Sequence, residues 1–251
     1  MSKFNPLKVK EIKRETPLAV SIVFDVPADL KADYQFEAGQ YVNIKSIING
    51  EELRRSYSIS SSPKSNELRI VVKAVENGSF STYATQQLQT GDVLEVAQPE
   101  GKFVLENKNA KIIAGIAAGS GITPIISLAK DTLENAADTT FVLIYGNKSI
   151  EDTIHYNEIE ALKSQYLGRF FVHYTFTKEH PDGSLFGRIE RSTINFVMKN
   201  KHNEKQFDEY FLCGPEDMIK KVTDVLKENG TAEEQIHYEL FTTSSTNGEI
   251  P

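Results

Sequence analysis

The sequence predicts two domains: an N-terminal antiparallel β-barrel and a C-terminal α/β domain with a doubly wound parallel sheet. Three observations predict this fold class. The 251 residues exceed the usual size of one domain. Short apolar runs separated by turn residues fill the first hundred positions, as in barrels and sandwiches. From residue 110, apolar runs alternate with amphipathic stretches, which favours a parallel sheet with helices on both faces.

Turn residues such as Asn49-Gly50, Asn77-Gly78 and Thr90-Gly91 divide the first half into short segments. We expect these segments to be strands, with one helix among them. The expected strands are Lys8–Lys13, Ala19–Phe24, Tyr41–Ile47, Ser56–Ser60, Leu68–Val75 and Val93–Ala97, and the helix runs from about Thr82 to Leu88.

The second half repeats a unit of one strand followed by one helix. The expected strands are Lys111–Ala117, Thr140–Tyr145, Phe170–Phe176, Tyr210–Cys213 and Gln235–Phe241. The expected helices are Pro124–Leu133, Tyr156–Tyr166, Ser192–Lys199 and Pro215–Asn229. The change of pattern predicts one domain over 1–104, a second over 105–241 and a polar, linker-like tail over 242–251. Such a tail is either a frayed end or a link to a further domain.

Composition excludes several function classes. The formal net charge of −7 argues against a general nucleic-acid or anionic-membrane surface. The single cysteine, Cys213, cannot form an intramolecular disulfide or supply a cysteine-ligated iron–sulfur or zinc site. The five histidines show no metal-ligand spacing. No run reaches the length of a signal peptide or membrane span, so we expect a cytoplasmic protein.

The segment Ala118–Pro124 joins an expected strand to an expected helix. Gly119 and Gly121 permit a tight turn and let backbone N–H groups approach a pyrophosphate. Thr123 suits a helix N-cap and Pro124 the first helical position. Because proline replaces the third glycine of the usual fingerprint, the loop alone fits a dinucleotide site and a plain strand-to-helix turn equally.

Three further motifs accompany this loop. Arg55-Ser56-Tyr57-Ser58 has the form R-x-Y-S, Gly78-Ser79-Phe80-Ser81 the form G-x-x-S, and Cys213-Gly214-Pro215, with Met218, the form C-G-P-x-x-M. The loop itself reads G-x-G-x-x-P. In order and spacing the four resemble the flavin and nicotinamide motifs of the ferredoxin–NADP reductase superfamily, across nearly the whole chain.

This resemblance implies a bound FAD. Arg55 would pair with the pyrophosphate, because a guanidinium matches phosphate oxygens bidentately. Tyr57 would stack on the isoalloxazine, and Ser58 would hydrogen-bond at flavin N5. The remaining FAD contacts would come from Val72, Lys73, Gly78, Phe80, Ser81 and Thr82. Taken singly, these residues also fit a solvated strand edge, a barrel core or a helix cap.

The resemblance also implies a nicotinamide site. It places the Cys213 thiol beside the nicotinamide C4, followed by Gly214 and Pro215, with the loop residues Gly119, Gly121, Thr123 and Pro124 around the same junction. Glu239 and Phe241 resemble the carboxylate and aromatic that approach the flavin edge in relatives. The alternatives are a small buried hydrophobe for Cys213 and core packing for Phe241. Tyr57, Ser58, Cys213 and Glu239 are the expected catalytic residues.

The choice between NADP(H) and NAD(H) depends on charge near the ribose. Thr177, Lys178 and Arg188 resemble the 2′-phosphate segment of bacterial ferredoxin–NADP reductases, and Lys148 adds a cation. Glu151 and Asp152 could instead serve an NAD ribose. The sequence favours NADPH.

The expected activity is hydride transfer from NADPH to FAD, followed by electron transfer to an iron–sulfur acceptor. The closing Tyr-Glu-Leu-Phe and the polar tail resemble reductase components of phenylacetyl-CoA oxygenase-type multicomponent oxygenases. There a [2Fe–2S] domain follows, so the expected partners are such a domain or protein and an oxygenase component. The alternatives are a stand-alone ferredoxin or flavodoxin reductase, and a flavin-binding electron-transfer or sensor subunit without nicotinamide activity.

Overall fold

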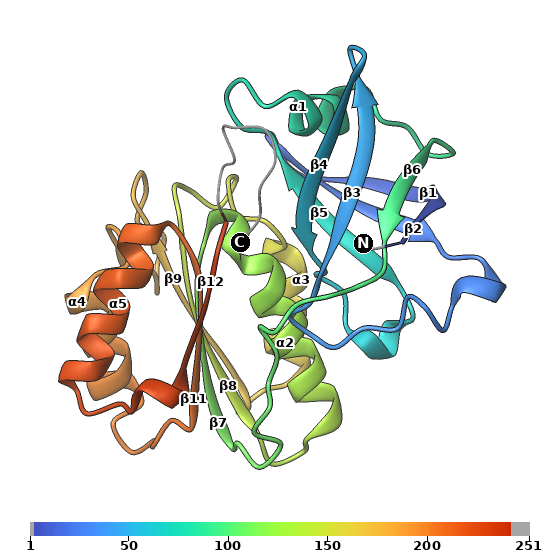
Figure 1. The fold of residues 1–251 in the computed structure, drawn as a ribbon. Helices are drawn as coiled ribbons and strands as arrows, with labels where there is room; N and C mark the ends of the chain where they lie inside the picture. Colours follow the sequence, from blue (N-terminus) through green and yellow to red (C-terminus); the bar gives the residue numbers. More distant parts are fainter. Residues whose placement is uncertain (1–2, 242–251) are drawn as a thin grey trace.

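The computed structural model describes residues 3–241 and contains two six-stranded sheets, one in each half of the chain (Figure 1). The first sheet is antiparallel and curled, and the second is parallel with helices on both faces. The predicted fold class is therefore confirmed. The tail predicted over 242–251 lies outside the described residues.

The first sheet has the strand order β4-β3-β6-β1-β2-β5. An antiparallel bridge between Ile59 and Ile70 joins its two edges and closes the barrel. Alternate residues point inward, as the period of two requires, and Val42, Ile44 and Ile70 are almost fully buried. The strands are β1 (Phe4–Thr16), β2 (Ala19–Asp25), β3 (Tyr41–Ile48), β4 (Glu51–Ser58), β5 (Leu68–Lys73) and β6 (Val93–Ala97), and the helix α1 (Ser79–Gln86) covers one end.

The second sheet has the order β10-β9-β8-β7-β11-β12, with every neighbouring pair parallel. Its strands are β7 (Ile112–Ala118), β8 (Thr140–Asn147), β9 (Phe170–Phe176), β10 (Leu185–Phe186), β11 (Glu209–Gly214) and β12 (Ile236–Leu240). Its helices are α2 (Ile122–Asn135), α3 (Tyr156–Gln165), α4 (Arg191–Asn195) and α5 (Glu216–Glu228). The helices α2 and α3 cover the face toward the barrel, and α4 and α5 cover the other (Figure 1).

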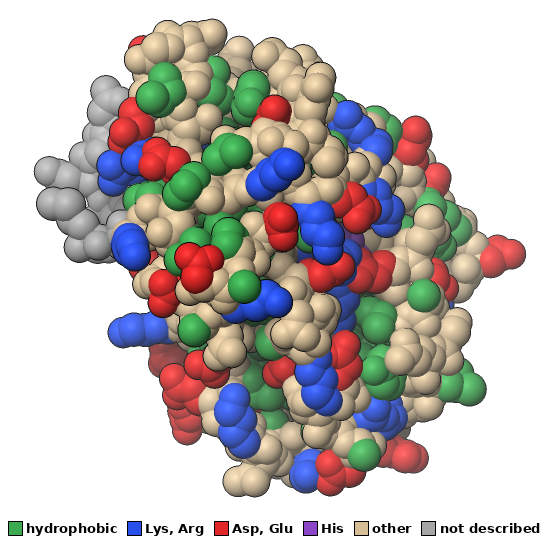
Figure 2. Space-filling view, turned by 90° about the vertical axis from the view of Figure 1, so that its right-hand side faces the viewer, with side chains coloured by type: hydrophobic (Ala, Val, Ile, Leu, Met, Phe, Trp, Pro, Cys, Tyr) green, Lys and Arg blue, Asp and Glu red, His purple; other side chains and the backbone are tan. Residues whose placement is uncertain are grey.

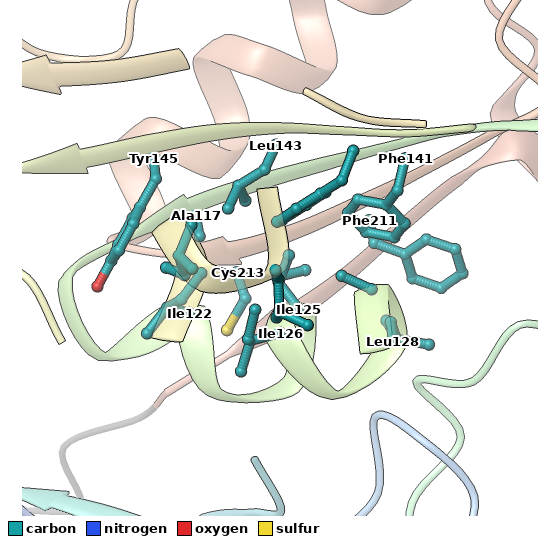
Figure 3. Packing of buried hydrophobic residues seen from close by; sticks show 14 of the residues in the cluster. Ala117, Ile122, Ile125, Ile126, Leu128, Phe141, Leu143, Tyr145, Phe211 and Cys213 are labelled. Carbon is teal, nitrogen blue, oxygen red and sulfur yellow. The ribbon is translucent and has the colours of Figure 1, made fainter. Parts of the chain in front are cut away.

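The apolar core beneath α2 also includes side chains of the barrel strands. Ile122, Ile125 and Ile126 pack against the side chains of β7, β8 and β11 (Figure 3). The same cluster includes Ala19 and Val71 of the barrel strands. The two halves therefore share a continuous apolar contact.

Surface charges are mixed on the face shown in Figure 2, where acidic and basic side chains are interspersed. No helix within residues 3–241 is long and apolar enough to cross a membrane.

Several element boundaries differ from the sequence prediction. The helix α1 begins at Ser79 rather than near Thr82, and α2 begins at Ile122 rather than Pro124. The expected helix Ser192–Lys199 is split into α4 and a π-helical turn over Phe196–Lys201. The two-residue strand β10 was not predicted, because two residues are too few to show periodicity.

Candidate functional site

The end of β4 meets the end of β12, and this contact joins the two halves at the predicted flavin motif. The Ser58 hydroxyl donates to Glu239 Oε2 at 3.2 Å. Glu239 lies beside Cys213 in the parallel register of β12 and β11. The structure thus brings together three predicted catalytic residues that lie up to 181 positions apart in the sequence.

The Glu239 carboxyl lies in a poorly hydrated environment. Burial raises its pKa to about 7, although the hydrogen bond from Ser58 lowers it. A carboxyl with this pKa is partly protonated at neutral pH and can therefore either give or accept a proton.

The Cys213 side chain is fully buried. Its sulfur lies under the first turns of α2, near Ile122 and Ile126 (Figure 3). Burial, and then the negative charge of Glu239, raise the pKa of this thiol well above its ordinary value. A protonated, packed thiol is no nucleophile, and the role of Cys213 in aligning a nicotinamide stays a prediction.

The flavin-motif side chains lie along β4. The Tyr57 ring packs on the Phe80 ring with centroids 5.6 Å apart, and burial raises the pKa of the Tyr57 phenol. Arg55 Nη1 donates to the Arg54 carbonyl. Within residues 3–241 the Arg55 guanidinium has no carboxylate partner. It therefore has donors available for a phosphate.

The N-terminus of α1 offers backbone donors to the same region. Gly78 is the N-cap and supplies no side-chain cap, so the amides of Ser79–Ser81 are open to an anion. The Phe80 side chain points into the barrel core, which leaves only its backbone for a ligand. The Thr82 amide already donates to the Gly78 carbonyl at 3.0 Å. Only the Thr82 hydroxyl remains available.

Ser81 and Gly78 pack tightly at this helix end. The Ser81 hydroxyl accepts from the Val75 amide at 3.2 Å, and a Cβ at Gly78 would overlap that hydroxyl oxygen. The glycine is thus required by close packing. Together, the free guanidinium, the uncapped helix and the partly exposed Tyr57 fit the pyrophosphate and ring of FAD.

The loop Gly119–Gly121 is a 3-10 turn between β7 and α2. Gly121, rather than Thr123, is the N-cap of α2. The N-cap role predicted for Thr123 is wrong, because its hydroxyl donates to the Ser120 carbonyl at 3.0 Å from within the first turn. Pro124 is the third helical residue, where its missing N–H costs no intrahelical bond.

The end of β11 approaches this loop closely. A Cβ at Gly121 would overlap the Cys213 carbonyl oxygen and lie 2.8 Å from the Gly214 nitrogen. Gly214 ends β11, and Pro215 follows as the N-cap of α5. The structure therefore brings the G-x-G-x-x-P and C-G-P motifs into direct contact. Phe241 lies beyond β12 with 42% of its surface exposed, so it is available to a ligand rather than packed in the core.

Two side chains near the loop were not predicted to have a role there. The Tyr145 hydroxyl donates to the Gly119 carbonyl at 3.0 Å. The Lys73 ammonium lies beside Gly119, and burial lowers its pKa while Asp152 partly opposes that shift. The sequence predicts an FAD contact for Lys73, as for the buried Val72, but no contact with this loop. The sequence signal that could have indicated this contact is an isolated lysine at the end of an apolar strand.

Two of the cations predicted to bind a 2′-phosphate, Lys148 and Lys178, follow the carboxyl ends of β8 and β9, and Arg188 follows β10. The Lys178 amide donates to the Lys148 carbonyl at 2.9 Å, and the Thr177 amide donates to the Asn147 carbonyl. The side chains of Lys148, Lys178 and Arg188 are exposed. None of these three cations forms an ion pair within residues 3–241. The alternative NAD ligand Asp152 accepts from the Ser149 hydroxyl at 2.9 Å.

The barrel with its uncapped α1 and the parallel sheet with its glycine turn before α2 define a class of protein. This class is the flavin- and nicotinamide-dependent oxidoreductases. Residues 6–105 match the family model of the oxidoreductase FAD-binding domain, and residues 116–224 match that of the oxidoreductase NAD-binding domain. The chain is also 36% identical over 250 residues to one of the subunits of the 1,2-phenylacetyl-CoA epoxidase of Escherichia coli, covering 98% of this chain and 70% of that one.

Solved structures give the same result for the fold. A ferredoxin NADP+ reductase from Neisseria gonorrhoeae with bound FAD and NADP superposes with a TM-score of 0.82 at 22% identity, covering 96% of this chain and 99% of that one. A phthalate dioxygenase reductase, described as modular for electron transfer from pyridine nucleotides to [2Fe–2S], gives 0.74 at 24% identity, with 97% and 70% covered. The chain belongs to the ferredoxin–NADP reductase superfamily and is an FAD-dependent NAD(P)H oxidoreductase.

Proposed function

We propose that this protein transfers hydride from NADPH to FAD and passes electrons to a [2Fe–2S] acceptor, as the reductase component of a phenylacetyl-CoA-type oxygenase. The observation that carries the proposal is the hydrogen bond between Ser58 and Glu239, at the place where the flavin motif meets the nicotinamide half. Residues 1–104 would bind FAD and residues 105–241 the nicotinamide dinucleotide, with 242–251 as a linker.

The chain's own residues have separable roles in this proposal. Arg55 and the amides at the α1 N-terminus hold the pyrophosphate of FAD, while Tyr57 covers the ring. The bound flavin supplies the exchange between two-electron and one-electron chemistry. The Ser58 hydroxyl donates to Glu239, and in this proposal it would also hydrogen-bond at flavin N5, so a proton would pass between the carboxyl and that atom through the hydroxyl. Cys213 and the Gly119–Gly121 turn orient the nicotinamide.

The preference for NADPH is supported by charge. Lys148, Lys178 and Arg188 carry cationic side chains without carboxylate partners among the described residues, a suitable environment for a 2′-phosphate. Of the two acidic alternatives, Asp152 accepts a hydrogen bond from Ser149 in its own loop, and Glu151 is exposed.

The choice of acceptor is supported by two relatives. One belongs to a phenylacetyl-CoA epoxidase, and the other is a phthalate dioxygenase reductase that transfers electrons from pyridine nucleotides to [2Fe–2S]. The second candidate is a stand-alone reductase of a separate ferredoxin. Because this chain has one cysteine, the cluster must lie outside residues 1–251 in either case.

Anaerobic titration of the FAD-loaded protein with NADPH, and separately with NADH, tests the proposal. We expect the flavin absorbance to bleach with both nucleotides and to bleach faster with NADPH. Absence of bleaching with both contradicts hydride transfer, and faster bleaching with NADH contradicts the nucleotide preference. Subsequent addition of a [2Fe–2S] ferredoxin should reoxidise the flavin.

Replacing Arg55 with alanine should weaken FAD binding about 10- to 100-fold, the usual effect of losing a charge-assisted phosphate contact. The dissociation constant can be measured from the recovery of FAD fluorescence on dilution. Arg54→Ala is the matched control. Arg54 precedes Arg55 on β4, is exposed, and pairs with Glu52 rather than remaining free for a phosphate. Equal loss of FAD in both variants would show that the role assigned to Arg55 is wrong.

A further inference from the structure

A buried lysine connects the two halves of the molecule behind the site. Lys130, on α2, is 5% exposed. Its ammonium donates to the Ser60 carbonyl at 2.9 Å and pairs with Glu158 Oε1 of α3 at 2.6 Å. Ser60 lies two residues beyond the flavin-motif residue Ser58. The lysine therefore contacts the segment that leaves β4.

Lys130 belongs to one face of α2 that receives this segment. Ser127, one helical turn earlier, donates to the Ser61 carbonyl at 2.7 Å. Glu134, one turn later, accepts from the Ser62 hydroxyl. Positions three and four apart lie on one face of a helix, so all three contacts form a single row. The row runs along the same helix whose first turn follows the Gly119–Gly121 loop.

Glu158 links the same Lys130 ammonium to a second barrel residue. Its carboxylate also pairs with Arg69 Nη1 of the barrel at 3.2 Å and with His155 Nδ1 at 2.9 Å. Burial would raise the pKa of Glu158, but its contact with His155 and the charges of Lys130 and Arg69 hold it well below its usual range. The carboxylate is therefore ionised and pairs firmly with the lysine.

We propose that Lys130 is a positioning residue for hydride transfer, because it fixes the segment behind the flavin motif against the helix that carries the nicotinamide loop. The inference rests on the proposed function. Hydride transfer requires the two reacting atoms at near-attack distance, and a displacement of about 1 Å can cost about 100-fold in rate. Lys130 lies eight residues from the start of α2, about 12 Å from the loop, and touches neither cofactor site itself.

The test compares Lys130→Met with Lys163→Met. Methionine keeps an unbranched chain but removes the charge and the donors. Lys163 is the control, because its ion pair with Glu160 lies within α3 and is more exposed than that of Lys130, with 44% and 36% of the two side chains accessible. Anaerobic stopped-flow reduction by NADPH gives the limiting rate and the nucleotide dissociation constant separately. Amide hydrogen exchange on the flavin-free chain reports the segment 60–64 independently of activity.

Lys130→Met should lower the limiting rate about 10- to 100-fold with the NADPH and FAD dissociation constants within about threefold of wild type. Exchange should rise in segment 60–64 and remain unchanged in α5. Lys163→Met should match wild type in every measurement. A limiting rate within twofold of wild type overturns the proposal. The proposal is also overturned if the rate loss comes with equal losses of NADPH and FAD affinity and with faster amide exchange throughout the chain. That result would indicate a general structural role for Lys130.

If Lys130→Met does not fold, Glu158→Gln replaces it. That variant keeps the Ser60 contact and removes the charge partner, and it should lower the limiting rate about 3- to 10-fold with both affinities retained. An unchanged rate again overturns the proposal. Failure of the wild-type protein to accept hydride from either nucleotide would contradict the proposed function instead, while the exchange measurement would still decide whether Lys130 holds the segment.

Discussion

Gly121→Ala is expected to lower the free energy of unfolding by about 3 kcal/mol and to weaken NADPH binding at least tenfold. The added Cβ would overlap the Cys213 carbonyl oxygen, which belongs to the backbone and cannot rotate away. Either the loop or the end of β11 must move, and both belong to the proposed nicotinamide site. Urea unfolding of the FAD-loaded protein and NADPH titration measure the two effects.

Gly168→Ala separates this clash from the ordinary cost of replacing a glycine. Gly168 has φ +81° and no atom within 4 Å of its built Cβ, so only backbone strain of about 1 kcal/mol is expected. Gly121 is N-cap at φ −60° and has no such strain. Similar losses in the two variants, with NADPH binding intact in both, would show that the contact between the two motifs is not tight.

The sequence was sufficient for the fold class because its periodicities are strong. Alternation in the barrel strands and the strand-then-helix rhythm after residue 110 both follow from which face of each element is buried. Boundaries at helix starts were less accurate. Thr123 has the side chain of an N-cap, but the 3-10 turn before α2 starts the helix at Ile122, and the hydroxyl bonds within that turn.

The candidate site was predictable only as separate motifs. Ser58 and Glu239 each resemble a residue of the ferredoxin–NADP reductase superfamily. No local sequence pattern shows that they share a hydrogen bond across 181 positions. Lys73 and Lys130 illustrate the remaining gap. A lysine in an apolar strand or helix is unusual, and the sequence shows that much. Each of these two lysines contacts a group in the other half of the chain, so only the tertiary structure identifies Gly119 as the neighbour of Lys73 and the Ser60 carbonyl as the acceptor for Lys130.

Glu239 should make stability fall as the pH rises. Its pKa in the folded chain is about 7, above the ordinary value of 4.5, so between these two values the folded state holds a proton that the unfolded state has released. The stabilisation is fully present below pH 4.5 and is lost as the pH approaches 7. A difference of this size corresponds to about 3 kcal/mol.

Glu239→Gln removes the titration while it keeps a side chain of the same size that can pair with Ser58. The difference in unfolding free energy between wild type and variant should therefore shift by about 3 kcal/mol against the wild type from pH 4.5 to pH 8. Urea unfolding of the flavin-free chain across this range measures it. Glu233→Gln, at a side chain that is 84% exposed, controls for the general loss of one acidic residue. A pH-independent difference for Glu239→Gln would mean that the carboxyl is ordinarily hydrated, and a proton route from Glu239 through Ser58 would lose its basis.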